Sequence, residues 1–410
     1  MTQSPELQKR SAKLIILVAA LGYFVDIYDL VLFSIVRVPS LKGIGIADAE
    51  LLDKGVLLLN MQMFGMLIGG ILWGILGDKR GRLSVLFGSI FLYSIANIAN
   101  GFVSGIYSYA ALRLIAGIGL AGELGAGITL VSETMPKESR GYGTTIVATI
   151  GIMGAVAAAL IGDVFPWRTS YFIGGGLGLV LLLLRIGVYE SGMYESVKQN
   201  KAIERGNFFR LFATKARALR YLSVIFIGVP IWYAVGILIT FSPEIGKAMG
   251  MSEVPNTRWA IMYTYIGLSI GDFSSGALSQ WMKNRRRVVL LFLMLTALFV
   301  VAYFVLAKVS ITTFYAVCVG LGFATGYWAV FVTIASEQFG TNIRATATTT
   351  APNFVRGAVV LLTSLFQAGK AILGVQGSAV AVGVLTLAIA FLALSRLDET
   401  YGKDLDFTES

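Results

Sequence analysis

Six ionisable side chains stand well inside long apolar stretches of the chain, away from the ends of these stretches, so that little water is available to stabilise their charge. A charge at membrane depth is costly unless it is paired or hydrated, so such groups mark ion and substrate pathways. Carboxyl groups there can carry protons, and a guanidinium can bind a carboxylate through two parallel hydrogen bonds. The pattern predicts proton-coupled movement of an anionic solute. The six residues are Asp26, Asp29, Arg113, Glu123, Asp272 and Arg356.

Asp26 is predicted to carry the transported proton, because it lies near the middle of the first apolar stretch. If that stretch is helical, Asp26 is about 18 Å from its start at Leu14. Asp29 lies three residues further on and shares a helical face with Asp26. It is interpreted either as a second carboxylate in a binding cavity or as a residue of the outer gate.

Arg356 is the most informative residue for the substrate. It stands in the segment APNFVRGAVV together with Asn353, which faces the same way on a helix. The Pro and Gly of this segment can loosen the backbone beside a cavity. A guanidinium here favours binding of a carboxylate. The competing interpretation is an ion pair with Asp272 or a helix-end role, and a permanent pair would remove the preference for anions.

Aromatic and polar side chains are predicted to complete a cavity for the substrate. Tyr and Trp also anchor helices at the membrane interface, but Tyr327 and Trp328 stand in the middle of an apolar stretch, where that explanation is weaker. Besides Asp29, Asn353 and Arg356, the substrate-binding candidates are Tyr28, Gln62, Trp232, Tyr233, Tyr263, Tyr327 and Trp328.

The composition indicates a membrane protein that is not an enzyme. The chain is 56% hydrophobic and only 14% charged, against about 25% charged in a soluble domain. It has no His and one Cys, Cys318, and neither a nucleophile–base set nor a metal cluster is recognisable. Gly117, Gly119 and Gly122 match the dinucleotide-binding fingerprint, but the surrounding apolar run favours close helix packing instead. We therefore predict no metal and no cofactor.

Twelve apolar stretches have the length, about 17–25 residues, that a helix needs to cross the membrane. With both termini in the cytoplasm, 22 of the 33 Lys and Arg residues fall in cytoplasmic segments and 8 in outer segments. That bias favours this orientation and explains the net charge of +10 without nucleic acid. The predicted spans are 14–36, 55–76, 83–102, 107–131, 143–163, 170–189, 220–241, 259–281, 288–307, 311–335, 346–369 and 373–395.

One signature occurs once in each half of the chain, as SETMPKESR at 132–140 and as SEQFGTNIR at 336–344. The copies are 204 residues apart, close to half of the 410-residue chain. Two similar apolar halves indicate a transporter built from parallel repeats. The expected domains are an N-terminal six-helix bundle at 1–189, a cytoplasmic linker at 190–219, a C-terminal six-helix bundle at 220–395 and a cytoplasmic tail at 396–410.

These features resemble the major facilitator superfamily over nearly the whole chain. GILGDKRGR at 74–82 is similar to the family's signature loop, and RLIAGIGLAGE at 113–123 resembles the fourth helix of its sugar porters, metabolite:proton symporters and organic-ion transporters. The resemblance implies an all-α membrane protein with twelve transmembrane helices in two pseudo-symmetric six-helix bundles. It also implies a cytoplasmic gate built from Gly77, Asp78, Arg80, Gly81, Arg82, Glu133, Arg140, Glu337 and Arg344.

The same resemblance implies that Asp26 pairs with Arg113, because an acid on the first helix pairs with the arginine of the fourth-helix signature in these branches. Protonation of Asp26 would break that pair and permit the loaded carrier to close. The fifth helix lacks the Gly-Pro signature of antiporters, which favours symport or uniport. The sugar-porter signature after the sixth span is also altered, with Tyr189 and Gly192 at its two proline positions.

The predicted function is proton-coupled import of a small organic acid or amino acid by a monomer in the cell inner membrane. Its partners are the small-molecule substrate, protons and the lipid bilayer. One alternative is a symporter or uniporter of a neutral solute, such as a sugar or nucleoside, which would tolerate Gln at Arg356. A remote alternative is a nutrient receptor that does not transport.

Overall fold

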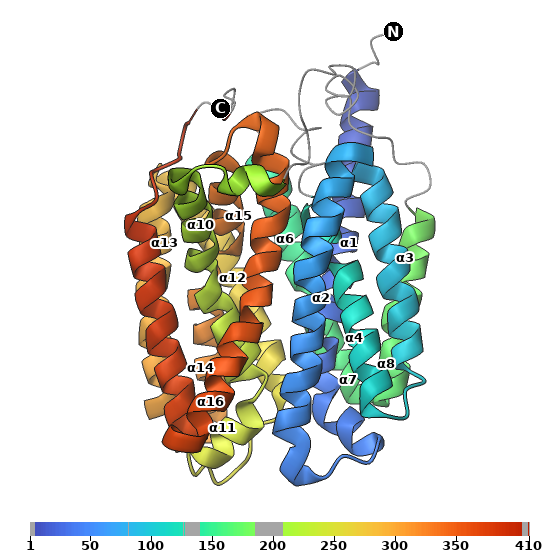
Figure 1. The fold of residues 1–410 in the computed structure, drawn as a ribbon, viewed down its shortest axis with the longest axis vertical. Coiled ribbons are helices and arrows are strands. Elements are labelled where there is room, and N and C mark those ends of the chain that lie inside the picture. Colours follow the sequence, from blue (N-terminus) through green and yellow to red (C-terminus); the bar gives the residue numbers. More distant parts are fainter. Residues whose placement is uncertain are drawn as a thin grey trace.

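The computed structural model describes residues 5–80, 82–125, 127, 140–184, 208–403 and 409, and the elements it assigns there are helical. The helices stand side by side as two bundles, with those of the first half in one bundle and those of the second half in the other (Figure 1). The first bundle contains α1 (Pro5–Gly43), α2 (Leu51–Arg80), α3 (Arg82–Asn100), α4 (Ile106–Leu120), α6 (Arg140–Ile152), α7 (Gly154–Val164) and α8 (Trp167–Leu184).

The second bundle is built in the same way from the second half of the chain. Its short elements are η2 (Phe208–Phe212), the π-helical turn η3 (Ala234–Ile239) and η4 (Ala307–Val309). Its helices are α10 (Lys215–Tyr233), α11 (Ser242–Ala248), α12 (Thr257–Trp281), α13 (Arg285–Val305), α14 (Ile311–Thr325), α15 (Trp328–Glu337) and α16 (Thr341–Ser395). The first bundle contains the short element η1 (Asp48–Glu50).

Each of the twelve predicted spans begins within a described helix, and eight helical segments are long and apolar enough to cross a membrane. Helices are the expected solution, because a backbone in hydrocarbon must satisfy its hydrogen bonds internally. The last two predicted spans lie within α16, which is interrupted at Gly374 (φ 70°, ψ 176°). The structure thus confirms the predicted all-α membrane fold.

Close helix contacts explain the glycine-rich segments of both halves. A Cβ at Gly117 of α4 would collide with the Gln62 carbonyl oxygen on α2, and one at Gly322 of α14 would collide with the Thr264 carbonyl oxygen on α12. Glycine lets these backbones approach directly, as in other membrane helix pairs. The two contacts occupy corresponding places in the two bundles.

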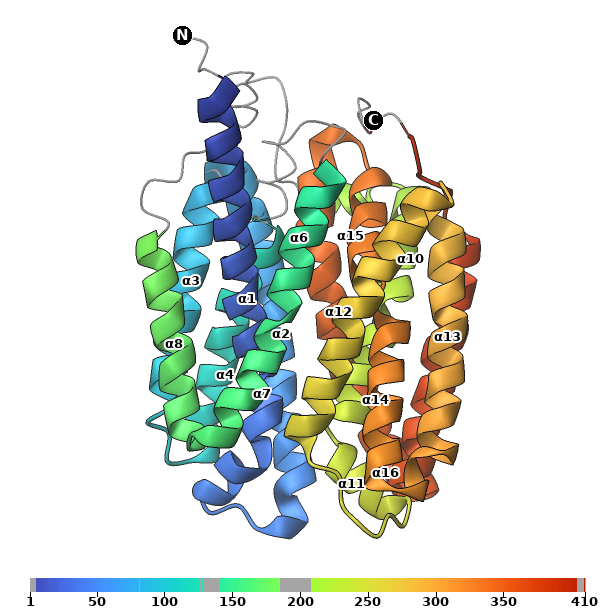
Figure 2. The ribbon, with the colours of Figure 1, turned by 180° about the vertical axis from the view of Figure 1, so that it is seen from behind.

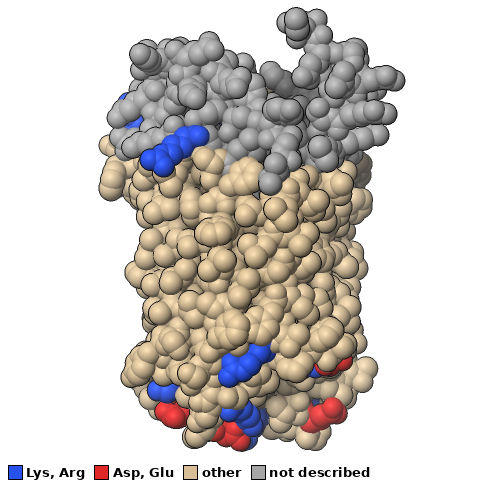
Figure 3. Space-filling model, turned by 90° about the vertical axis from the view of Figure 1, so that its right-hand side faces the viewer, with Lys and Arg blue, Asp and Glu red and all other residues tan. Residues whose placement is uncertain are grey.

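The bundles meet along α1, α2, α6 and α7 on one side and α12 and α16 on the other. Figure 2 shows α7 and α12 running side by side at this junction. The start of α1 and the end of α16 lie at the same end of the molecule (Figure 1). On the described part of the face in Figure 3, Lys, Arg, Asp and Glu gather toward the ends and leave a belt of other residues between them, as expected for a surface in contact with lipid.

Candidate functional site

Asp26 of α1 and Arg356 of α16 face each other across the junction of the two bundles. The Asp26 Oδ2 atom lies 3.9 Å from the Arg356 Nη2 atom, and both side chains are almost completely buried. This separation is long for a charge-assisted hydrogen bond. Asp26 therefore faces Arg356, whereas the family resemblance had implied a pair with Arg113.

The Arg356 guanidinium has unused hydrogen-bonding capacity. Its Nε and Nη1 atoms are buried, and neither has a hydrogen-bond partner among the described residues. Its central carbon lies 5.5 Å from the ring centroid of Trp328, whose indole Nε1 is likewise buried without a partner in the described structure. A buried donor without an acceptor is costly, so this group is suited to accept an anionic ligand.

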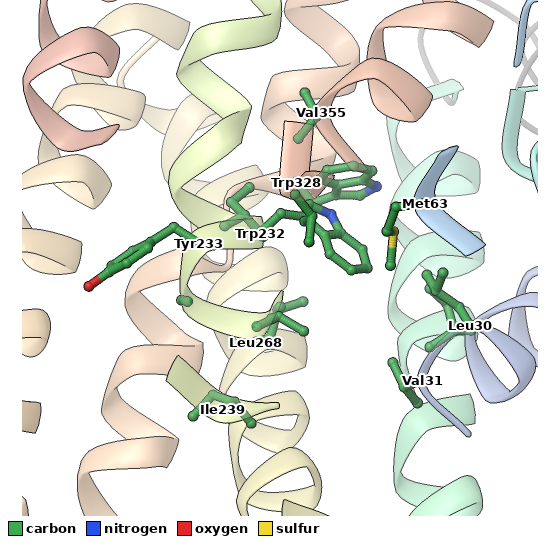
Figure 4. Close-up of a cluster of buried hydrophobic side chains, with 14 of the residues drawn as sticks. Leu30, Val31, Met63, Trp232, Tyr233, Ile239, Leu268, Trp328 and Val355 are labelled. Atoms are coloured by element: carbon green, nitrogen blue, oxygen red, sulfur yellow. The ribbon is translucent and has the colours of Figure 1, made fainter. Parts of the chain in front are cut away.

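Buried aromatic and aliphatic side chains of the two bundles meet at the junction. Figure 4 shows Trp232 and Trp328 of the second bundle directed toward Leu30 and Met63 of the first bundle. All four are buried. Small-molecule sites commonly combine such apolar walls with a few fixed polar groups. Trp328 joins this apolar cluster to the Arg356 guanidinium.

Asp29 occupies a different environment from Asp26 although it is only three residues away. Asp29 is fully buried inside the first bundle, where Arg113 and Asn97 are its charged and polar neighbours. A Cβ at Gly174 of α8 would collide with its carboxylate, so glycine makes room for it. A step of three residues turns a side chain by about 60° around a helix. That rotation directs Asp26 to the second bundle and Asp29 to Arg113.

Arg113 is held within the first bundle by several side chains. It donates hydrogen bonds to Tyr171 Oη at 3.2 Å and to Asn97 Oδ1 at 3.5 Å. Tyr171 in turn shares a 2.6 Å hydrogen bond with Tyr109, which donates to Ser40. Because these partners come from α1, α3, α4 and α8, they fix the guanidinium inside one rigid unit.

Asp272 of α12 does not pair with Arg356, which was the competing interpretation of that arginine. Its Oδ1 atom accepts a 2.7 Å hydrogen bond from the Ala329 backbone N–H at the start of α15. The Trp328 backbone N–H is a second donor to the same carboxylate. Asp272 therefore caps a helix, and its carboxylate does not neutralise Arg356.

Three of the four predicted tyrosines are fixed by hydrogen bonds within their own bundles, and the fourth by a ring contact. Tyr233 donates to the Ala379 carbonyl oxygen and points away from Trp232 in Figure 4. The hydroxyl groups of Tyr28 and Tyr327 donate to backbone carbonyl oxygens within their own bundles, and Tyr263 packs against a neighbouring tyrosine ring of α14.

Two predicted amide side chains lie near the junction. Gln62 donates to the Leu30 carbonyl oxygen, while its own Oε1 is buried without a hydrogen-bond partner among the described residues. Asn353 donates across the junction to the Ala121 carbonyl oxygen at 2.9 Å and also to Thr349 of its own helix. Asn353 thus holds the bundles together.

The predicted cytoplasmic gate is only partly described. Gly81 and Glu133 lie outside the described residues, as do the side chains of Asp78, Arg82 and Arg140; Gly77 is buried and Arg80 is exposed. Glu337 accepts two 3.1 Å hydrogen bonds from Arg285, and Arg344 donates to the Ser336 and Phe339 carbonyl oxygens. These second-half contacts lie within the second bundle.

Sequence reasoning missed a set of contacts between the bundles at the end opposite the start of α1. Fully buried Arg37 of α1 donates to both carboxylate oxygens of Glu244 on α11, at 2.7 and 2.9 Å. Asp53 of α2 pairs with Lys370 of α16, and Asp163 of α7 pairs with Arg258 of α12. We had placed Arg37 just beyond the first span. The only signal for its burial was its position directly after that apolar run.

No group of three or more His, Cys, Asp or Glu side chains in the described structure is placed to hold a metal ion. Two bundles of membrane-length helices, with buried charges facing each other between them, define an α-helical membrane transporter. The family model of the Major Facilitator Superfamily matches residues 19–364. The chain belongs to this superfamily, as its motifs had implied.

Two relatives that are named as transporters resemble the chain over most of its length. The putative niacin/nicotinamide transporter of Bacillus subtilis is 28% identical over 345 residues, which cover 83% of this chain and 84% of that protein. The 3-(3-hydroxy-phenyl)propionate transporter of Escherichia coli is 28% identical over 370 residues, covering 86% and 88%. These relatives confirm a transporter rather than an enzyme.

A solved structure, that of a D-xylose-proton symporter, has the same fold. It superimposes with a TM-score of 0.71 at 18% identity and covers 96% of this chain and 99% of that chain. At this identity the likeness concerns the arrangement of helices. It confirms the predicted superfamily fold.

Proposed function

We propose that the protein is a proton-coupled symporter that imports a small metabolite with a carboxylate and an apolar, preferably aromatic, body. One observation carries the proposal. Arg356 is buried between the bundles with two unused nitrogen donors and a carboxylate 3.9 Å away. Trp328 lies against it and Trp232 lies in the same apolar cluster, which suits an aromatic ring, and relatives named for niacin and 3-(3-hydroxy-phenyl)propionate support the same class.

Substrate binding is an exchange of carboxylates on Arg356. The incoming carboxylate first takes one unused donor, Nε or Nη1, and then displaces Asp26 from the adjacent Nη2 atom, where the contact of Asp26 is long. A bidentate pair with Arg is stronger and better oriented than a single distant contact. The aromatic body of the substrate packs against Trp232 and Trp328, which adds apolar burial.

Proton coupling follows from the fate of displaced Asp26. A buried carboxylate without its cation is costly, and uptake of a proton removes that cost. The bound anion and the proton together leave the net charge of the site unchanged. The loaded carrier can therefore close, and loss of the proton on the other side returns Asp26 to Arg356.

Alternating access requires both ends of the bundle junction to open in turn. The contacts of Arg37, Asp53 and Asp163 with the second bundle close the end opposite the start of α1. The bias of Lys and Arg supports the assignment of this end to the outside and of both termini to the cytoplasm. We place the protein in the inner membrane, acting as a monomer because one chain contains the whole site.

Uptake into proteoliposomes tests this function. Labelled carboxylates, amino acids, sugars and nucleosides are offered with and without an inward proton gradient, and each aromatic acid is paired with its neutral amide. Gradient-stimulated uptake of an aromatic acid, with at least tenfold weaker uptake of its amide, is expected. Uptake confined to sugars or nucleosides would contradict the role of Arg356, and uptake of the acid at equal rates without a gradient would contradict proton coupling.

A further inference from the structure

The predicted span at 311–335 is two helices rather than one. Helix α14 ends at Thr325, and α15 begins at Trp328 after Gly326 and Tyr327. Such a break leaves the first N–H groups of the second helix without partners in their own helix. Tyr327, at the N-cap position of α15, makes no side-chain capping hydrogen bond. The cap must come from elsewhere in the protein.

Asp272 supplies that cap from a neighbouring helix. Its carboxylate is 1% exposed and accepts hydrogen bonds from the backbone N–H groups of Ala329, at 2.7 Å, and Trp328. A negative charge is also favoured at a helix N-terminus by the helix dipole. A Cβ at Gly326 would come within 2.7 Å of the Asp272 and Gly271 backbone, so glycine lets α12 approach the break.

The capped residue is also part of the proposed binding site. Trp328 is the first residue of α15, and its ring lies below the Arg356 guanidinium, 5.5 Å from ring centroid to central carbon. The position of that ring therefore depends on where the N-terminus of α15 is held. Asp272 is the buried side chain that holds it.

We propose that Asp272 is a positioning residue, which fixes Trp328 beneath Arg356 and so sets the affinity for the carboxylate substrate without carrying the transported proton. This inference rests on the proposed function. Two properties of the side chain separate these roles. An acceptor oxygen suffices for capping, whereas an ionisable carboxyl group is needed to carry a proton.

Two substitutions in proteoliposome uptake test the proposal. Asp272→Asn keeps an acceptor oxygen for Ala329 but cannot ionise; we expect KM to rise roughly two- to threefold, with gradient-driven accumulation retained. Asp272→Ala removes the cap; we expect KM to rise about tenfold or more, with a much smaller change in maximal rate. Loss of accumulation in Asp272→Asn, with counterflow exchange retained, would make Asp272 a proton carrier and overturn the proposal.

A double-mutant cycle separates positioning from general loss of stability. Once Trp328→Phe has removed the indole, Asp272→Ala should raise KM by less than about threefold more, because coupled residues have non-additive effects. Fully additive effects would contradict the proposal. If Asp272→Ala is not recovered folded, Asp272→Thr, a shorter capping acceptor, replaces it in the cycle. Failure of the proposed function can be told apart from failure of the Asp272 proposal, because in the former case the unmodified protein would take up no carboxylate.

Discussion

The two acid–arginine sites of α1 differ in what encloses them. Asp29 faces Arg113, and the guanidinium is held by Tyr171 and Asn97 within a single bundle. Asp26 faces Arg356 in the other bundle, across a 3.9 Å separation. Contacts within one bundle can persist while the bundles rock, but contacts between bundles must break and re-form. On the proposed mechanism, this difference favours a structural role for the Asp29 site and a transport role for the Asp26 site.

The sharpest test of this contrast compares the same substitution at the two acids. Asp26→Asn should abolish gradient-driven accumulation, a loss of about 10–100-fold, while counterflow exchange continues, because this side chain can no longer release a proton. Asp29→Asn should retain accumulation in the folded fraction but lower the stability, since it leaves Arg113 buried without its acid. Accumulation ratios and thermal unfolding in detergent measure both effects. The reverse pattern would exchange the two roles.

Arg356 gives a prediction of similar size, which concerns the affinity for a carboxylate compared with its neutral amide. Arg356→Gln should raise KM for an aromatic acid about 10–100-fold, because hydrogen bonds to a charged group are worth about 1.5–3 kcal/mol. The neutral amide of the same acid should be affected less than threefold. Uptake of the acid and amide pair measures this. An equal effect on both compounds would remove Arg356 from carboxylate recognition.

A smaller effect is expected where the contrast extends to the contacts of Arg37, Asp53 and Asp163 between the bundles. Glu244→Gln weakens the pair with Arg37 between the bundles, so the junction at this end should open more often. The probe is a cysteine introduced by Ser34→Cys, in a protein whose buried Cys318 is replaced by Ala. This cysteine should react with maleimide several-fold faster when Glu244→Gln is present than when Glu244 is retained. Glu337→Gln is the control, since it alters a pair inside one bundle and should leave that rate unchanged. Equal acceleration by both variants would contradict the contrast.

The smallest effect is expected at Glu399, whose contacts lie within the second bundle. Burial raises the pKa of this carboxyl, but backbone N–H groups of Arg286, Arg285, Tyr401 and Thr400 outweigh it and lower the pKa below its ordinary value. A depressed pKa adds stability above the unfolded value of about 4.3, and that stability is lost as the pH falls through the folded value.

Glu399→Gln should therefore lower the unfolding free energy at pH 7 by about 0.2–1 kcal/mol, a figure reduced by solvent exposure. The difference from the unmodified protein should shrink as the pH falls below about 4. Thermal unfolding in detergent from pH 3 to pH 7 measures it, with exposed Glu253→Gln as the control. A difference that is constant with pH would rule out the carboxylate as its source.

The fold could be predicted from the sequence because its determinants are local. Apolar runs of membrane length and a signature repeated after 204 residues define helices and two halves without any knowledge of packing. The partners of buried charges are not local. Asp26 and Asp29 are so close in sequence that a modest rotation of α1 decides which arginine each one faces, and packing sets that rotation.

The remaining surprises have the same origin. Arg37 follows the first apolar run and cannot be distinguished from an ordinary loop charge in the sequence. In the structure it pairs with Glu244 of α11. Asp272 was recognised as a buried acid, but its partner is a backbone terminus created by the break at Gly326 and Tyr327. Neither residue type identifies its partner, because Glu244 is far from Arg37 in the sequence and the backbone donors to Asp272 leave no pattern of side chains.

The long contact between Asp26 and Arg356 has a consequence for the carrier that has released its cargo. On the proposed mechanism, Asp26 returns to Arg356 as its counter-ion once the substrate has left. The empty carrier therefore does not reorient with an unpaired positive charge in its interior. A symporter must reorient without substrate to complete its cycle. An obligatory exchanger reorients only with substrate bound. On this mechanism, the 3.9 Å contact must be weak enough for the substrate to displace Asp26 and strong enough to neutralise Arg356 during the return.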